Sequence, residues 1–214
     1  MILLTALKMP RELDRDLLRN VVEKLFSNEK NKDFFESIAK RDDSSSACES
    51  LFAYSLLYEQ ILSLPCRTSP PSDLILARNE NGKPFFENSD VKFNISHSKG
   101  YVACAASVGE DVGVDVEASN ITEEKAKKLA KRYFGEQEIA EVKKCPKVFA
   151  RIWSEKEAKA KFFGDSVGNI LFNEKSNANF YISYGVKLHR FAIDNIPITL
   201  CTKRDFSTIS CTIG

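Results

Sequence analysis

The chain has 214 residues, of which 43% are hydrophobic and 29% charged, and its formal net charge at pH 7 is +1. Such a composition is typical of a globular protein with one large or two small domains. Because the charges nearly cancel, no overall positive field favours nucleic acid, and we expect no nucleic-acid partner. No apolar run is long enough to span a bilayer and no signal peptide is recognisable, so the sequence predicts a cytoplasmic protein with no membrane partner.

The cysteines and histidines do not suggest a metal centre. The six cysteines are scattered, none belongs to a Cys-x-x-Cys pair, and the chain has only two histidines. This pattern argues against a zinc site, and reduced thiols in a cytosolic protein are its simplest explanation.

The first part of the chain predicts a short strand followed by two helices. Residues 1–7 have the pattern of a strand, and Pro10 is expected to open an amphipathic helix that continues to Leu25. The serine cluster Ser44–Ser46 is expected to cap a second helix. That helix must end near Pro65, where a proline-containing loop begins.

A turn and two strands are predicted next. Asn81–Pro84 has a turn signature, and runs of apolar residues predict strands at Val91–Ile95 and Tyr101–Val108. We expect Ser96–Gly100 to form the loop that joins these two strands.

The turn Gly109–Asp111 is the candidate boundary between two halves, residues 1–110 and 111–214. Beyond it, Thr122 is expected to cap a helix that runs to about Phe134. Further strands are expected at residues 180–188, 190–193, 198–202 and 207–213. Because helices and strands occur in both halves, the sequence predicts an α+β fold.

The segment just after this boundary is a strand with two carboxylates on one face. Val112, Val114 and Val116 alternate with polar or small residues, among them Asp115 and Glu117. Side chains two apart in a strand point to the same side, so the two carboxylates lie together while the valines face the core. Their mutual repulsion would be relieved by a hard cation such as magnesium. The alternative is an edge strand with a solvated acidic face.

A later helix adds a third carboxylate and a lysine. Pro146 suits its first turn and Gly164 suits its end. Glu157 and Lys161 are four residues apart and so share one face of this helix. Alone, the pair would be an ordinary surface salt bridge. With Asp115 and Glu117, it completes the set of groups that a magnesium ion on a substrate phosphate requires.

Four motifs in their order and spacing resemble the 4′-phosphopantetheinyl transferases, in their long, monomeric, surfactin-type (Sfp-like) branch. The motifs are Gly82-Lys83-Pro84, Phe93-Asn94-Ile95-Ser96-His97-Ser98, Gly113-Val114-Asp115-Val116-Glu117 and Trp153-Ser154-Glu155-Lys156-Glu157-x-x-x-Lys161. The resemblance implies two similar α+β subdomains related by a pseudo-twofold, with the ligand in the cleft between them. Residues 1–110 would supply phosphate and adenine contacts, and residues 111–214 the metal-binding carboxylates and the catalytic helix.

The resemblance also implies an activity. Enzymes of this family transfer the 4′-phosphopantetheine arm of coenzyme A to a serine hydroxyl of an apo acyl or peptidyl carrier protein and release 3′,5′-ADP. Coenzyme A would be the co-substrate and Mg²⁺ the cofactor. The carrier protein belongs to fatty-acid, polyketide or nonribosomal-peptide biosynthesis, and the sequence does not say which.

Residue roles follow from the same resemblance. Asp115, Glu117 and Glu157 would bind the metal, and Lys161 would contact the pyrophosphate of coenzyme A as a point charge. Either Glu157 or Glu138, the latter through a water, would take the serine proton as general base. These assignments leave the choice of base open.

The cofactor contacts are the remaining implied roles. Ser96 and His97 would contact phosphate, with His97 on the 3′-phosphate, and Gly82-Lys83-Pro84 would line the adenine. Lys30 and Ser46 match further phosphate-binding positions. Three departures are visible. Asp33 stands where relatives often have a lysine, Ser44–Ser46 lacks the arginine common there, and Asp165-Ser166-Val167 follows the catalytic helix where a Gly-x-Gly-like loop is usual.

Two other functions are compatible with parts of this pattern. One is a magnesium-dependent phosphohydrolase that acts on a nucleotide with the same carboxylates. The other is a non-catalytic module that binds coenzyme A or a carrier protein. A complete set of Asp115, Glu117, Glu157 and Lys161 argues against the second, because a binding module needs no metal triad.

Overall fold

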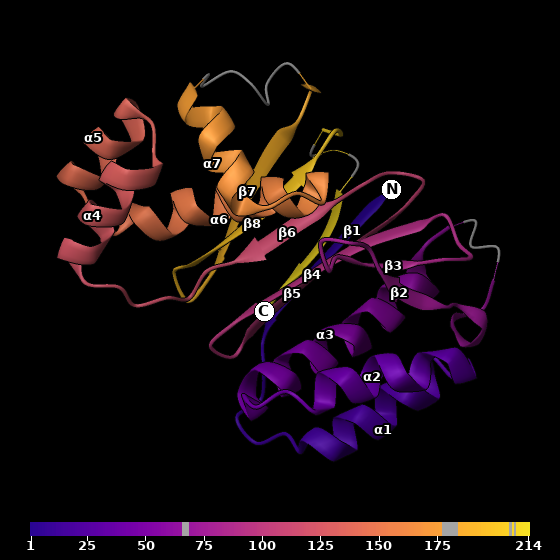
Figure 1. Ribbon diagram of the computed structural model, residues 1–214. Coiled ribbons are helices and arrows are strands. Elements are labelled where there is room, and N and C mark those ends of the chain that lie inside the picture. The colour runs from indigo at the N-terminus through magenta and orange to yellow at the C-terminus, as the bar shows by residue number, and fades with distance from the viewer. Residues whose placement is uncertain (66–68, 177–183, 206, 208) are drawn as a thin grey trace.

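The computed structural model describes residues 1–65, 69–176, 184–205, 207 and 209–214, and confirms the predicted α+β fold (Figure 1). In the first half the elements are β1 (Ile2–Lys8), α1 (Arg15–Leu25), η1 (Glu29–Asn31), α2 (Lys32–Ala39), α3 (Ser44–Ser63), η2 (Pro71–Asp73), β2 (Leu76–Arg78), β3 (Pro84–Phe86), β4 (Val91–Ser98) and β5 (Tyr101–Val108). In the second half they are β6 (Gly113–Val116), α4 (Glu123–Tyr133), α5 (Glu136–Lys144), α6 (Val148–Phe163), α7 (Val167–Ser176), β7 (Lys187–Ile193), β8 (Ile196–Thr202) and β9 (Ile209–Ile213).

Two sheets pack against each other and carry helices on their outer faces (Figure 1). The first sheet has the strand order β4-β5-β1-β9, and the second has the order β6-β8-β7. Between them lies an apolar core that joins Leu4 and Ala105 of the first sheet to Val114 and Leu200 of the second. Helices α1 to α3 cover the first sheet through a larger core that includes Phe35. Helix α6 packs on the outer face of the second sheet through a smaller core.

A row of side-chain hydrogen bonds joins the edge strand β4 to β6. The Oδ1 of Asn94 accepts from the backbone N–H of Val114 at 2.9 Å. Ser96 and Ser98, at alternate positions on β4, continue this pattern. The Ser96 hydroxyl accepts from the backbone N–H of Val116 at 3.2 Å, and the Ser98 hydroxyl accepts from that of Ala118 at 3.1 Å. This polar seam fixes the register of β6 against β4, and it therefore fixes where Asp115 lies relative to Ser96.

Helix α6 lies unusually close to β6 because the strand begins with glycine. A Cβ placed on Gly113 would lie 2.1 Å from the carbonyl oxygen of Ala158 and 2.5 Å from the backbone nitrogen of Phe162. No side chain fits in that space, so glycine permits the contact that brings the acidic strand next to the helix that carries Glu157.

The predicted helix boundaries are partly wrong for local reasons. Helix α1 begins at Arg15 rather than near Pro10, because the Asp14 side chain accepts from the N–H of Leu17 and caps it. Helix α3 includes Ser44–Ser46, since Asp43 is its N-cap. The expected Thr122 cap is confirmed.

The strand β4 is longer than the sequence suggested. It continues through Ser98, and the turn to β5 is only Lys99–Gly100, both with positive φ, at 48° and 84°. Because such a two-residue turn matches the twist of paired strands, Ser96 and His97 remain paired with β5 instead of forming a loop. This places their side chains on the rigid edge of a sheet.

The end of the second half also differs from expectation. The sequence pattern does not predict helices α5 and α7, and the predicted helix end at Gly164 is confirmed by its φ of 66°. The expected strand at residues 180–188 lies partly outside the described residues, and β7 begins at Lys187. Strand β9 returns to the first sheet and pairs in parallel with β1, so one strand of residues 111–214 belongs to the sheet of residues 1–110.

Two further findings concern cysteines and membranes. The five cysteines in the described part of the chain are all free thiols, whereas Cys66 lies outside it. Among the helices that the structure describes, none combines the length and the apolar character needed to cross a bilayer.

Candidate functional site

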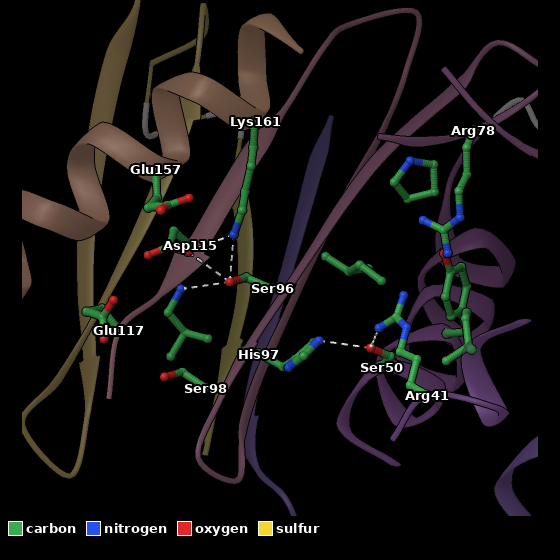
Figure 2. A pocket seen from close by; sticks show the side chains of 15 residues that line it. Arg41, Ser50, Arg78, Ser96, His97, Ser98, Asp115, Glu117, Glu157 and Lys161 are labelled. Atoms are coloured by element: carbon green, nitrogen blue, oxygen red, sulfur yellow. Dashed lines mark hydrogen bonds and ion pairs between the residues drawn. The ribbon is translucent and has the colours of Figure 1, made fainter. Parts of the chain in front are cut away.

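A cleft of about 380 Å³ opens between the two halves (Figure 2). Its lining comes from α2, α3 and the segment between them, from β2, β3, β4 and β6, and from helix α6. The charged and polar lining residues are Arg41, Ser50, Arg78, Ser96, His97, Ser98, Asp115, Glu117, Glu157 and Lys161. Acidic groups therefore line the side formed by the second half, and arginines line the opposite side (Figure 2).

The three predicted metal ligands all reach this cleft. Asp115 and Glu117 come from β6 and its end, and Glu157 faces them from α6. Asp115 is 5% exposed. Its Oδ1 accepts from the Ser96 hydroxyl at 2.9 Å and from the Lys161 ammonium at 2.7 Å. Its Oδ2 is buried and has no hydrogen-bond partner.

The pKa of Glu157 is raised by its surroundings. Burial raises the pKa of this carboxyl group, and the negative charges of Asp115 and Glu117 raise it further. The positive charge of Lys161 and a hydrogen bond from Trp153 act in the opposite direction. Three carboxylates thus share one poorly solvated wall, where a bound cation would favour the ionised form of each.

These residues fit a hard divalent cation, although they are not gathered around one. Within the described ranges, no three His, Cys, Asp or Glu side chains are close enough together to form a ready metal site. The donors are carboxylate oxygens, which magnesium prefers, and the unpartnered Oδ2 of Asp115 has a lone pair for which the fold supplies no donor. The Lys161 ammonium contacts the other oxygen of Asp115.

The imidazole ring of His97 lies between two side chains of α3. Its Nε2 lies 2.8 Å from the Ser50 Oγ, and its Nδ1 lies 2.9 Å from Oε2 of Glu49. Burial lowers the pKa of His97, and the nearby Glu49 carboxylate opposes this. Both ring nitrogens therefore already have partners.

Two arginines that the sequence analysis missed line the cleft. Arg41, in the short segment before α3, donates to the Ser50 Oγ at 2.9 Å. The guanidinium of Arg78, at the end of β2, lies 4.6 Å from the ring centroid of Phe34 and donates to the Gly82 carbonyl. These two arginines bring positive charge to the cleft. No local motif marks either arginine.

The predicted adenine loop lies beside the cleft. Gly82, Lys83 and Pro84 line an adjoining cavity of about 230 Å³ together with Lys161, and Pro84 and Lys161 also line the main cleft. Gly82 has a φ of 80°, which favours glycine. The Lys83 ammonium donates to the carbonyl of Phe162 at 3.3 Å.

Three other predicted residues are not brought to the cleft. Lys30 is exposed within η1, and Ser46 is half-buried in the first turn of α3. Glu138 accepts from the Gly135 N–H at the start of α5 and forms an ion pair with Lys156. Lys156 is also paired with Glu174 of α7. Glu138 therefore belongs to an ionic cluster that joins α5, α6 and α7.

Comparison with known proteins agrees with this geometry. Residues 111–201 match the profile of the 4′-phosphopantetheinyl transferase superfamily, and residues 15–109 match that of the 4′-phosphopantetheinyl transferase N-terminal region. The chain is 31% identical over 169 residues to the 4′-phosphopantetheinyl transferase gsp of Aneurinibacillus migulanus, a match that covers 77% of this chain and 66% of gsp. It is 31% identical over 109 residues to the 4′-phosphopantetheinyl transferase HetI of Nostoc sp., covering 47% of this chain and 46% of HetI.

An α+β fold with an acidic and a basic wall facing one cleft is the framework of a phosphate-handling enzyme. The chain belongs to the 4′-phosphopantetheinyl transferase superfamily, and its two matched regions meet at residues 109–111, where the sequence placed the boundary between halves.

Proposed function

We propose that this protein transfers the 4′-phosphopantetheine arm of coenzyme A to a serine hydroxyl of an apo acyl or peptidyl carrier protein. The observation that carries the proposal is the cleft between the halves, in which Asp115, Glu117 and Glu157 face Arg41 and Arg78. Acidic groups that suit a cation and basic groups that suit phosphates are what a pyrophosphate-containing co-substrate requires. The superfamily match supports this choice over a nucleotide phosphohydrolase.

Asp115, Glu117 and Glu157 would hold a magnesium ion. When bound, the ion would polarise the pyrophosphate and offset the charge that develops on the departing 3′,5′-ADP. Lys161 would add a positive charge from the same helix face as Glu157. Because its ammonium contacts Asp115 at 2.7 Å, it already lies where the acidic group and the phosphate would meet.

We assign the general base to Glu157 rather than Glu138. Glu157 lines the cleft, where a carboxylate oxygen not used by the ion could accept a proton. It would take the proton of the carrier serine as the serine oxygen bonds to phosphorus and the bond from phosphorus to 3′,5′-ADP breaks. Glu138 is instead engaged in the ionic cluster with Lys156.

The arginine-lined side would bind the phosphates of coenzyme A. Arg41, Ser50, Arg78 and His97 lie together in the first half and face the acidic wall (Figure 2). Guanidinium groups match phosphate oxygens in geometry and charge. The cavity beside Gly82–Pro84 would take the adenine.

The wider setting is also part of the proposal. The two halves would be related by a pseudo-twofold, and the protein would act as a cytoplasmic monomer that meets its carrier protein transiently. The carrier is defined by its chemistry alone, as a small protein that presents one reactive serine hydroxyl.

The deciding experiment is intact-mass spectrometry of candidate apo-carriers after incubation with the protein, coenzyme A and Mg²⁺. We expect a mass gain of one phosphopantetheine arm, abolished by EDTA and by Asp115→Ala. The matched control is Asp16→Ala, which changes an exposed aspartate on α1. If coenzyme A is cleaved at an equal rate without any carrier, the phosphohydrolase is correct. Near-normal turnover by Asp115→Ala would refute the metal assignment.

A further inference from the structure

A buried glutamate lies directly behind the histidine of the cleft. Glu49 is 4% exposed and projects from α3 toward β4. Its Oε2 lies 2.9 Å from Nδ1 of His97, and its Oε1 accepts from the backbone N–H of Gly100 at 2.5 Å. Both carboxylate oxygens are thus occupied, one by the ring and one by the turn between β4 and β5.

This arrangement determines where the imidazole proton lies. A buried carboxylate needs donors, and Nδ1 can satisfy Glu49 only if it carries a proton. In a neutral ring the Nε2 is then a lone pair, to which the Ser50 hydroxyl can donate while its oxygen accepts from Arg41. His97 at rest therefore presents an acceptor to the cleft.

Such an acceptor cannot by itself bind a phosphate dianion, whose oxygens are also acceptors. If Nε2 gains a proton and a phosphate oxygen takes the place that the Ser50 hydroxyl holds at 2.8 Å, the ring becomes a cation between Glu49 and the phosphate and donates to both. The groups that face the ring are Glu49 and Ser50 on α3, Arg41 before α3, and Lys161 on α6. Among these four, only Glu49 is anionic, so it is the residue that favours the charged ring.

We propose that Glu49 is a positioning residue for His97: it fixes the proton on Nδ1, directs Nε2 into the cleft and supports the imidazolium that forms when a phosphate group binds there. The proposal rests on the proposed function for the identity of that phosphate, the 3′-phosphate of coenzyme A. It makes phosphate binding coupled to the uptake of one proton by His97.

The linear order Glu49, His97, Ser50 also has the form of a nucleophilic triad. The environment of Ser50 disfavours that role. Ser50 is 3% exposed and lies within α3, well past the first turn whose N–H groups are free to stabilise an oxyanion. Its oxygen already accepts from Arg41, which makes it a weaker nucleophile.

The chain is well suited to a direct test because it has only two histidines. In protein labelled with ¹⁵N-histidine, the ring shifts of His97 report its tautomer and charge, and His189 serves as an internal control for the fold. At about pH 7.5 we expect free His97 to be neutral with the proton on Nδ1. Saturation with adenosine 3′,5′-bisphosphate should shift both ring nitrogens to imidazolium values. A proton on Nε2 in the free protein, or a neutral ring in the complex, would overturn the proposal.

Variants can distinguish whether Glu49 stabilises the His97 imidazolium or simply repels the bound phosphate. Glu49→Gln should weaken binding of adenosine 3′,5′-bisphosphate about tenfold and reduce the imidazolium signal, whereas Glu59→Gln, at an exposed site on the same helix, should do neither. In a His97→Gln background, Glu49→Gln should cause no further loss. If Glu49 merely repels the phosphate, Glu49→Gln will instead bind more tightly and the proposal is wrong.

This test can fail independently of the proposed function. Carrier modification with an unchanged His97 spectrum would refute the role of Glu49 alone. The expected spectra and binding without modification of any carrier would refute the transferase and leave the role of Glu49 in phosphate binding intact.

Discussion

Lys161 neutralises Asp115 inside the cleft, and its removal should have two opposite effects. The change we consider is Lys161→Met, which keeps an unbranched apolar side chain but removes the charge. The ammonium donates to Asp115 at 2.7 Å and to the Ser96 hydroxyl at 2.9 Å. Without it, Asp115 retains one hydroxyl donor and stays buried.

The loss of stability can be sized from these hydrogen bonds. Both hydrogen bonds come from a charged donor, and a hydrogen bond that involves a charged group contributes about 1.5–3 kcal/mol. The Lys161 side chain is 27% exposed, so solvent screening reduces the sum. We expect Lys161→Met to lower the free energy of unfolding by about 2–3 kcal/mol, a fall in Tm of roughly 4–12 °C for a chain of this size.

Added Mg²⁺ should raise the Tm of Lys161→Met more than it raises the Tm of the wild type. With its internal cation removed, Asp115 should bind Mg²⁺ more tightly. A cation at tenfold its Kd stabilises by about 1.4 kcal/mol, so the two proteins should be compared at one Mg²⁺ concentration by differential scanning fluorimetry. Transfer activity should fall in the variant with every carrier tested, because the proposed partner of the Lys161 ammonium is coenzyme A and not the carrier.

The control is Lys127→Met on α4, where the lysine is 46% exposed and forms a surface pair with Glu123. It should shift Tm little, since such pairs contribute about 0.3–0.5 kcal/mol. An unchanged Tm in Lys161→Met, together with a Mg²⁺ response equal to that of the wild type, would refute the reasoning. A transfer defect confined to one carrier would place Lys161 on the docking surface instead.

Three other predictions concern the surroundings of the cleft. Because burial raises the pKa of Glu157 above 4.5, this carboxyl group binds more protons in the folded metal-free protein than in the unfolded chain between about pH 4.5 and the raised pKa. Glu157 should therefore contribute a free energy of unfolding that falls as pH rises through this range, and the difference between the wild type and Glu157→Gln in urea titrations at several pH values should show that contribution. Lys156→Met should cost about 2–3 kcal/mol, because it removes the cation that Glu138 and Glu174 share, although Glu174 keeps its pair with Lys159; a loss below about 1 kcal/mol by urea denaturation would contradict the cluster. Gly113→Ala should lower the free energy of unfolding by about 1–3 kcal/mol or more, the usual cost of an overpacked core. Because the new Cβ would push α6 away from β6, transfer should also fall where the protein stays folded. Full activity at the wild-type Tm would show that the helix can shift freely.

The parts of the site that follow from local periodicity were predictable from the sequence. Asp115 and Glu117 share a face because strands repeat every two residues, and Glu157 and Lys161 share one because helices repeat every 3.6. All four residues line one cleft in the structure. The roles assigned to them remain predictions.

The other side of the cleft depends on contacts that no local pattern encodes. Arg41 and Glu49 reach the site only because α3 packs against β4, far along the chain. His97 was expected in a loop, and the two-residue turn at Lys99–Gly100 keeps it in a strand instead. In the sequence, an isolated charged residue near the start of a helix that lines a cleft looks the same as one that faces solvent.

The pairing of β1 with β9 has a consequence for how the chain folds during synthesis. Ile2 is synthesised long before its partner Ile209. At 5–20 residues per second, roughly 10–40 s separate the two strands. Meanwhile every residue that lines the cleft, up to Lys161, has already been made. One edge of β1 therefore waits with unpaired N–H and C=O groups, a template for other strands. Strand β6, which carries Asp115, waits in the same way for its neighbour β8, so the first strand and the functional site both need protection until the later strands are made.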